Sequence, residues 1–209
     1  MKKNYISNST ESTRMFKSNL LESLSKVHFT VPLFVYVPVV IYFSYRALTA
    51  PLNIGTFALC FIGGLAVWTI TEYLLHRYIF HFVPKAEWAL LLHFIFHGVH
   101  HDYPKDAKRL VMPPSASIPL AVGFYFLFSL FFKEKAYLWS FYPGFITGYL
   151  VYDMMHYAMH HYNFKSSLMK RVKQHHMLHH YDDSTKGYGV SSSLWDEIFR
   201  SGFPKKQKA

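Results

Sequence analysis

The chain has 209 residues, of which 51% are hydrophobic, 19% aromatic and only 16% charged. This length fits one domain with a full core, and the composition argues against a soluble domain and for a membrane protein. The formal net charge is +10, but no recognised nucleic-acid-binding module accompanies the basic residues, so we expect no nucleic-acid partner. The one cysteine, Cys60, excludes an internal disulfide and a cysteine-ligated iron–sulfur or zinc site.

The first 30 residues begin with a polar stretch that has no apolar core, which argues against a signal peptide. Apolar residues then recur at helical spacing between residues 15 and 27, with Lys17 and Lys26 among them. This pattern predicts a cytosolic helix, either on the membrane surface or packed on the protein's own cytosolic part. We predict an N-terminal segment at 1–30, a single domain at 31–203 and a polar tail at 204–209.

Four apolar segments are each long enough, with their flanking residues, to cross a bilayer as a helix. They cover residues 31–48, 54–75, 118–132 and 138–157. Short connections join the first to the second and the third to the fourth, so the spans are expected to form two hairpins. In the second span Gly63 and Gly64 permit close contact with another helix.

The basic residues are distributed unevenly around these spans. Five lie in residues 1–30, five between His76 and Ser117 and nine after Tyr157, against two in the connection 133–137. Because cytosolic segments carry the excess of Lys and Arg, both termini are expected in the cytosol. The sequence therefore predicts an all-α integral membrane protein of a bacterial inner membrane or the endoplasmic reticulum, with a cytosolic, histidine-rich helical cap.

Thirteen of the fourteen histidines lie in three short regions of the chain. The pattern HxxHH occurs twice, and on a helix its first, fourth and fifth positions share one face. One such stretch can hold a metal ion and two indicate a metal pair, because imidazole is a ligand for zinc, iron, copper and nickel. The two stretches are His97, His100 and His101, and His176, His179 and His180.

Two further histidine pairs extend the pattern. His156 and His160 are four residues apart and share a helical face. His76 and His81 are five apart, which points them away from each other on a straight α-helix. We therefore expect either that a helix ends between these two or that each serves a different ion. The spacing itself leaves His161 and the histidine at 175 as open candidates.

An acidic residue, Asp153, lies near the end of the fourth span. Carboxylates in membrane-spanning helices are rare and usually functional. We expect Asp153 to accept an N–H from a ligating ring and so to fix its tautomer.

Five motifs together resemble the fatty acid hydroxylase superfamily of integral-membrane di-metal proteins, most closely its fatty acid 2-hydroxylase branch, over residues 31–203. The motifs are HRYIFH, HGVHHDYPKDAKRLVMPP, YDMMHYAMHH, HHMLHH and GYGVSSSLWDEIF. The histidine motifs are shared with sterol and carotenoid oxidases, whereas RLVMPP and GYGVSSSLWD favour the narrower branch. The resemblance implies ten metal ligands and leaves His93, His161 and His175 around them or in packing. The ten are His76, His81, His97, His100, His101, His156, His160, His176, His179 and His180.

The resemblance also implies an activity, namely O₂-dependent hydroxylation of a fatty acyl chain, at C2, in a free fatty acid or a sphingolipid. It implies two iron ions, although zinc competes for the same ligands in purified protein. Eukaryotic members often carry a fused cytochrome b5 domain, which residues 1–30 are too few to form. We therefore expect a separate electron donor, either cytochrome b5-like or ferredoxin-like. Four aromatic residues are expected to line the access route of the acyl chain: Phe94, Phe96, Tyr103 and Tyr188.

Two alternatives remain open at this point. One is another lipid oxidation of the same superfamily, by a sterol or carotenoid hydroxylase or desaturase. The other is a membrane protein that binds metal without catalysis, which predicts ligands inside the spans, whereas the histidines cluster outside them.

Overall fold

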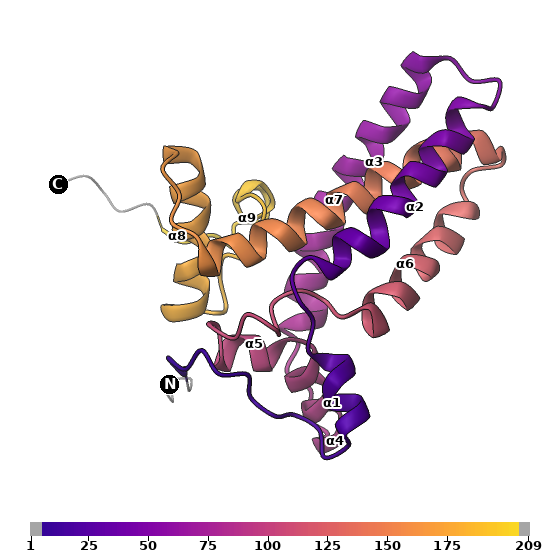
Figure 1. The fold of residues 1–209 in the computed structure, drawn as a ribbon. Helices are drawn as coiled ribbons and strands as arrows, with labels where there is room; N and C mark the ends of the chain where they lie inside the picture. The colour runs from indigo at the N-terminus through magenta and orange to yellow at the C-terminus, as the bar shows by residue number, and fades with distance from the viewer. Residues whose placement is uncertain (1–5, 205–209) are drawn as a thin grey trace. The chain divides into compact units, whose positions relative to one another are not determined.

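The computed structural model of the chain describes residues 6–204, so residues 205–209 of the expected polar tail lie outside it. Within the described part the regular elements are helices and there is no strand, which confirms the all-α prediction (Figure 1). The chain forms two compact units, each assembled from separate stretches. We call residues 14–70 and 108–154 the apolar unit, and residues 1–13, 71–107 and 155–209 the histidine unit.

The apolar unit contains a helix at each of the four apolar segments of the sequence. It contains α1 (Asn19–Ser25), α2 (Val31–Leu48), most of α3 (Ile54–Leu74), α6 (Pro114–Ser129) and most of α7 (Lys135–His161). Among residues 6–204, two helices are long and apolar enough to cross a membrane: α2, and α3 with its continuation to Phe80. The third apolar helix, α6, is shorter. Two of the four spans thus have the required length and hydropathy, and the four-span arrangement stays a prediction.

Glycines allow α3 and α7 to pack with their backbones in contact. A Cβ on Gly64 would lie 2.1 Å from the carbonyl oxygen of Phe141, and one on Gly144 would lie 2.0 Å from that of Phe61. On Gly63 the nearest atom would be 3.8 Å away, so this glycine is not needed for the contact. Small residues at such positions are typical of helix pairs in membranes, where close packing replaces the hydrophobic effect.

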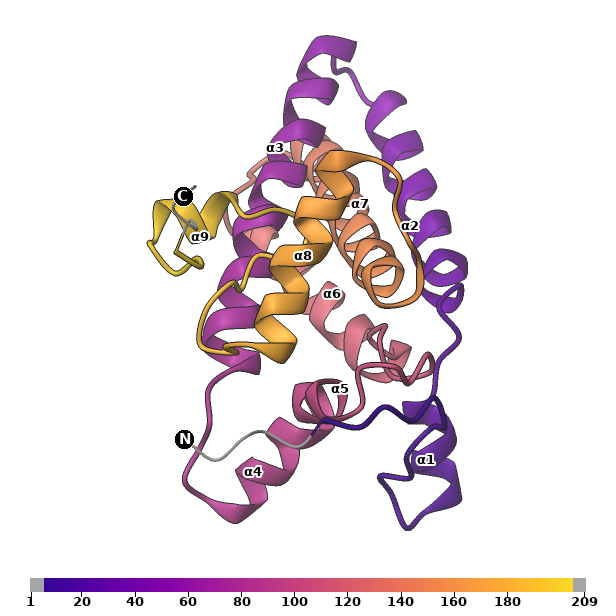
Figure 2. The same ribbon diagram turned by 90° about the vertical axis from the view of Figure 1, so that its left-hand side faces the viewer.

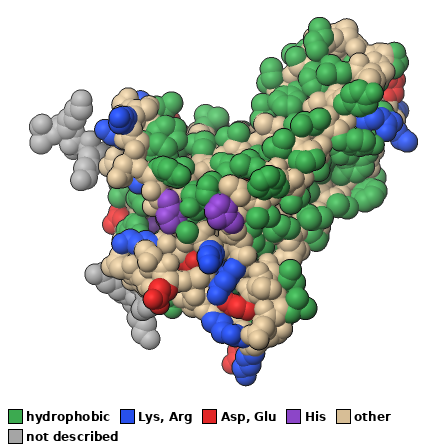
Figure 3. All heavy atoms as spheres, viewed as in Figure 1, with side chains coloured by type: hydrophobic (Ala, Val, Ile, Leu, Met, Phe, Trp, Pro, Cys, Tyr) green, Lys and Arg blue, Asp and Glu red, His purple; other side chains and the backbone are tan. Residues whose placement is uncertain are grey.

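The apolar unit exposes many large hydrophobic side chains. Phe34 is 78% exposed, Leu59 73% and Leu130 79%. Hydrophobic side chains cover much of the surface of these helices (Figure 3). Soluble proteins rarely expose apolar surface so extensively. This surface therefore fits contact with lipid.

The N-terminal helix α1 is shorter than the pattern between residues 15 and 27 predicted. It begins after Ser18, whose hydroxyl caps the amide of Leu21. The Glu22 carboxylate accepts hydrogen bonds from the backbone amides of Met15 and Phe16 at 2.9 and 3.0 Å. The amides of Met15 and Phe16 are thus bound to a side chain, and these two residues lie outside the helix.

The histidine unit consists of shorter helices and contains every predicted ligand. After the last turn of α3 come η1 (Leu75–Phe80), α4 (Glu87–His93), η2 (Phe94–Gly98) and α5 (Val99–Asp102). The end of α7 is followed by α8 (Ser167–Tyr181) and α9 (Leu194–Ile198), and Figure 2 shows the loop that leads from α8 to α9. η1 and η2 are π-helices, which the sequence did not predict.

Candidate metal centre

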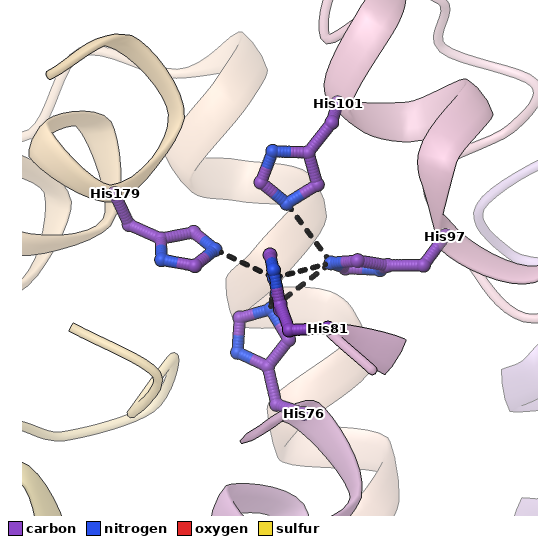
Figure 4. Close-up of side chains that lie close together, drawn as sticks. All are labelled: His76, His81, His97, His101 and His179. Atoms are coloured by element: carbon purple, nitrogen blue, oxygen red, sulfur yellow. Dashed lines mark hydrogen bonds between the residues drawn. The ribbon is translucent and has the colours of Figure 1, made fainter. Parts of the chain in front are cut away.

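Ten histidine rings of the histidine unit gather into two groups of five, and they are the ten ligands that the resemblance implied. Within each group the ligand nitrogens all lie within 4.8 Å of one another. Figure 4 shows the rings of the first group pointing toward one another. The first group is His76, His81, His97, His101 and His179, and the second group is His100, His156, His160, His176 and His180.

Each HxxHH stretch contributes to both groups. On α8, His176 and His180 join the second group, whereas His179 joins the first. At about 100° per residue, position i+4 lies some 40° to one side of position i and position i+3 some 60° to the other side. Each stretch therefore divides its rings between the two groups, a division that the sequence left open. The groups adjoin: the rings of His101 and His180 stack at 4.2 Å between centroids.

A π-helix explains how His76 and His81 meet. The amide of His81 donates to the carbonyl of His76 at 3.1 Å, which is the i to i+5 bond of a π-helix. This wider turn puts residues five apart on one face. The expectation that a helix ends between the two rings is confirmed, because η1 ends at Phe80 and His81 follows it. The alternative of one ring for each ion does not fit, since both rings lie in the first group.

The nitrogen positions of the first group suit ligands around a cation better than a hydrogen-bonded cluster. The Nε2 atoms of His76, His81 and His97 lie 3.1 Å from one another in all three pairs. Each nitrogen of a neutral ring is either a donor or an acceptor, so at least two atoms of such a triangle must be alike and cannot hydrogen-bond. A central cation removes this conflict, because all the nitrogens then act as acceptors.

The distances agree with metal coordination as well. With nitrogen–metal bonds of about 2.0–2.1 Å, two ligands at a right angle lie roughly 3.0 Å apart. In the second group the Nε2 atoms of His100, His156 and His180 show this spacing, at 2.9 Å for His156 to His100 and 3.0 Å for His100 to His180. The donor set is entirely imidazole, which suits iron, zinc, copper and nickel. Both groups therefore fit a metal ion.

Backbone carbonyls fix several of the rings through their second nitrogen. His76 Nδ1 donates to the carbonyl of Tyr188 at 2.5 Å, and His179 Nδ1 donates to that of Lys186 at 2.7 Å. His160 of the second group bonds to the backbone of Pro104. Once Nδ1 carries the proton, Nε2 has its lone pair free for a metal. These three carbonyls thus select the tautomer that a ligand needs.

Burial keeps the rings neutral. Burial, followed by the neighbouring rings, holds the pKa values of His97, His100, His101, His176 and His180 well below the ordinary value. Burial also lowers the pKa of His179 to about 4, and burial with the charges of His161 and Lys173 lowers that of His160 to about 3. Neutral imidazole is the form that binds a metal, so the fold presents these rings ready for coordination.

The other predicted site residues lie outside the two groups. His175 binds Asp196, with 2.9 Å between Nε2 and Oδ2. His161 packs its ring 4.6 Å from that of Tyr157, and His93 is half-buried. Asp153, in the apolar unit, accepts hydrogen bonds from the Tyr149 hydroxyl at 3.1 Å and the Met112 amide at 3.4 Å. Its bond to a ligating ring stays a prediction.

Sequence reasoning missed two buried carboxylates, Glu72 and Asp196. They are 4% and 0% exposed, and both bind the loop that carries the Tyr188 carbonyl. Glu72 had a signal, because it is the one charged residue in the apolar segment 54–75. Asp196 had none beyond its place in the GYGVSSSLWDEIF motif.

Comparison with protein families matches residues 61–201 to the family described as fatty acid hydroxylase. Fatty acid 2-hydroxylase of Rattus norvegicus is 37% identical to the chain over 216 residues, which cover 92% of this chain and 57% of the rat protein. Dihydroceramide fatty acyl 2-hydroxylase FAH2 of Arabidopsis thaliana is also 37% identical, over 90% of this chain and 79% of the plant protein. The chain thus spans a little over half of the rat relative.

A solved structure has the same fold. It is described as full-length scs7p with only the hydroxylase domain visible, and it superposes with a TM-score of 0.84 at 36% sequence identity. The match covers 89% of this chain and 70% of the other.

Proposed function

We propose that this chain, which belongs to the fatty acid hydroxylase family, hydroxylates the C2 position of a fatty acyl chain in a membrane lipid or free fatty acid. The observation that carries the proposal is the pair of all-histidine groups in a chain whose relatives are named fatty acid and ceramide hydroxylases. The overall reaction consumes O₂, two electrons and two protons, inserts one oxygen atom into a C–H bond and releases the other as water.

The metals that this reaction requires are two iron ions, one for each histidine group. Bound iron supplies the redox chemistry with O₂ that no side chain can perform. An all-imidazole site also holds zinc, which is not redox-active. We therefore expect purified protein to contain zinc unless iron is supplied, and expect hydroxylation from the iron form.

The chain's own residues hold the ligands and shield the site. The Nδ1–H groups of His76 and His179 stay on backbone carbonyls, which directs their Nε2 atoms to the first site. The rings of His76, His176 and His179 are at most 1% exposed, so water has little access to them. The Tyr188 ring lies 5.4 Å from that of His81, where it would border an acyl chain that reaches the first group.

The membrane delivers the substrate in this proposal. Four spans would hold the chain in the bilayer, with both termini and the histidine unit on the cytosolic side, as the distribution of Lys and Arg favours. The acyl chain would enter beside Phe94 and Phe96, and a separate cytochrome b5-like or ferredoxin-like protein would supply the electrons. The exposed Phe96, at 56%, supports such a lipid-facing route.

Incubation under ¹⁸O₂ tests the proposal. Membranes that contain the iron-loaded protein, an electron donor and a fatty acid or ceramide should yield a 2-hydroxyacyl product with one ¹⁸O, measured by lipid mass spectrometry. The His176→Ala variant should yield none. Absence of labelled product from the wild-type protein would contradict the proposal, and label in a sterol or carotenoid of the same extract would favour the other lipid oxidations of the superfamily.

A further inference from the structure

Two buried carboxylates hold four consecutive backbone amides beside the first histidine group. Asp196 accepts from the amides of Tyr188 and Gly189 at 2.9 and 2.7 Å. Glu72 accepts from those of Val190 and Ser191 at 2.9 and 2.7 Å. The loop 188–191 is therefore fixed by side chains where a helix or strand would use its own backbone.

Glu72 and His76, which follow one another on the same helix, both bind the segment 188–191. Glu72 and His76 are four residues apart, so they lie on the same face of the chain where α3 continues into η1. Glu72 binds the amides of Val190 and Ser191, and the nearby Tyr188 carbonyl accepts the Nδ1–H of His76. The same helix thus places the ring and, through the loop, the acceptor that orients it.

Asp196 secures the other end of the loop with a full set of donors. Besides the two amides, its carboxylate accepts from the Ser201 hydroxyl at 2.8 Å and contacts His175 Nε2 at 2.9 Å. The site demands a small residue as well, since a Cβ on Gly189 would lie 2.1 Å from the carbonyl of Ser192 and 3.0 Å from Asp196 Oδ2. A buried carboxylate is costly unless donors surround it, and here the donors are the loop.

We propose that Glu72 and Asp196 are positioning residues for the first histidine group. By holding loop 188–191, they keep the Tyr188 carbonyl on His76 Nδ1 and so keep His76 Nε2 directed at the first metal. This inference rests on the proposed metal-dependent function, and it assigns the two carboxylates to one ion of the pair. The rings of the second group lie against one another instead, with Nε2–Nε2 distances of 2.9–3.1 Å.

The test measures zinc release, which does not depend on hydroxylation. Full-length protein in detergent is loaded with Zn²⁺, a chelator is added, and the two equivalents are followed by a colorimetric zinc indicator and elemental analysis. Wild-type protein should release both equivalents slowly. Glu197→Gln, which changes the exposed carboxyl group beside Asp196, is the matched control and should behave like wild type.

Asp196→Asn and Glu72→Ala should each release one equivalent roughly 10–100-fold faster, the usual cost of losing an outer partner of a metal ligand. In Asp196→Asn an NH₂ group replaces one carboxylate oxygen and faces a backbone amide that previously donated to that oxygen. Two donors then oppose each other, and the hydrogen bond to the loop is lost. Glu72→Gln should stay near wild type, because its amide oxygen still accepts from Val190 and Ser191. His81→Ala should lose the same equivalent, and adding Asp196→Asn to it should not change release of the other.

Slow release of both equivalents from Asp196→Asn and Glu72→Ala would overturn the proposal. Equally faster release of both would overturn it too, since the carboxylates would then support the histidine unit as a whole. The unchanged second equivalent reports that each variant is folded. The variants could show the expected faster release of one equivalent while the iron-loaded wild-type protein makes no hydroxylated lipid. That result would contradict the proposed function and leave the positioning roles of Glu72 and Asp196 intact.

Discussion

The two histidine groups have the same composition but are held in different ways. The first group takes its rings from η1, the residue after η1, η2, α5 and α8, and two of its rings depend on carbonyls of residues 186 and 188. The second group takes four of its five rings as i, i+4 pairs from two regular helices, α7 and α8. Loop contacts therefore build the first site, and helix geometry builds the second.

The second nitrogens of the rings show the same contrast. Within residues 6–204, Nδ1 of His100, His176 and His180 is buried and has no hydrogen-bond partner. In the first group His76 and His179 have carbonyl acceptors within residues 186–188, whereas the acceptor of His160 in the second group is Pro104, outside that segment. Changes in the loop 188–191 or in the residues that hold it should consequently affect the first site and spare the second. Three predictions test the comparison of the two sites.

Loss of a ligand should have the largest effect, and it should be equal in the two groups. His81→Ala removes a ring of the first group and His180→Ala one of the second. Because the reaction is proposed to need both ions, each variant should lose activity by more than the roughly 10–100-fold cost of an outer partner, with labelled product below detection. Product is measured by lipid mass spectrometry.

His28→Ala is the matched control for these variants, because His28 is exposed and belongs to neither group. It should leave product formation unchanged. Substantial product from His81→Ala would mean that the first group is dispensable and would contradict the pairing of the two sites.

Gly189→Ala should have an intermediate effect and should separate the two groups. The added Cβ would meet the Ser192 carbonyl at 2.1 Å, so the loop must shift away from Asp196. We expect a loss of about 1–3 kcal/mol in the free energy of unfolding, typical of overpacking, and faster zinc release from one site. Thermal unfolding in detergent and chelator-induced zinc release measure the two effects.

Gly123→Ala provides the control with the same chemical change. A Cβ at Gly123, within α6, has no atom within 4 Å, and alanine favours a helix over glycine by up to about 1 kcal/mol. It should be neutral or slightly stabilising, with unchanged zinc release. Faster release of both zinc equivalents from Gly189→Ala would show that the loop supports both groups.

The sequence named the ten rings that form the two groups but not how they divide between them. Regular spacing identified His156 with His160 and the two HxxHH stretches, because i, i+3 and i+4 relations are local properties of a helix. The division needs the angle of each helix in the fold, and for His76 and His81 it needs a π-helix. π-helices are rare, so the sequence is interpreted as an α-helix, in which two rings five residues apart point away from each other.

The partners of the rings were harder to predict than the rings. The sequence directed attention to Asp153, because carboxylates often bind the second nitrogen of a ligating histidine. For His76, His160 and His179 the partner is instead a backbone carbonyl, a group that every residue has and no motif marks. Only the tertiary contacts of Glu72 and Asp196 show why the Tyr188 carbonyl stands in the right place.

The smallest expected effect comes from His175, which precedes a member of the second group. His175 reaches Asp196 at 2.9 Å but belongs to neither group, whereas His176 belongs to the second. His175→Ala leaves Asp196 with the Tyr188 and Gly189 amides and the Ser201 hydroxyl, so the loop keeps its main contacts. Losing this one partly exposed hydrogen bond should reduce product about 2- to 5-fold and speed zinc release from the first site alone.

His176→Ala, one residue further, should abolish product and release zinc from the second site. If the two substitutions were equally damaging, His175 would itself have to act as a ligand, and the division into two groups of five would be wrong.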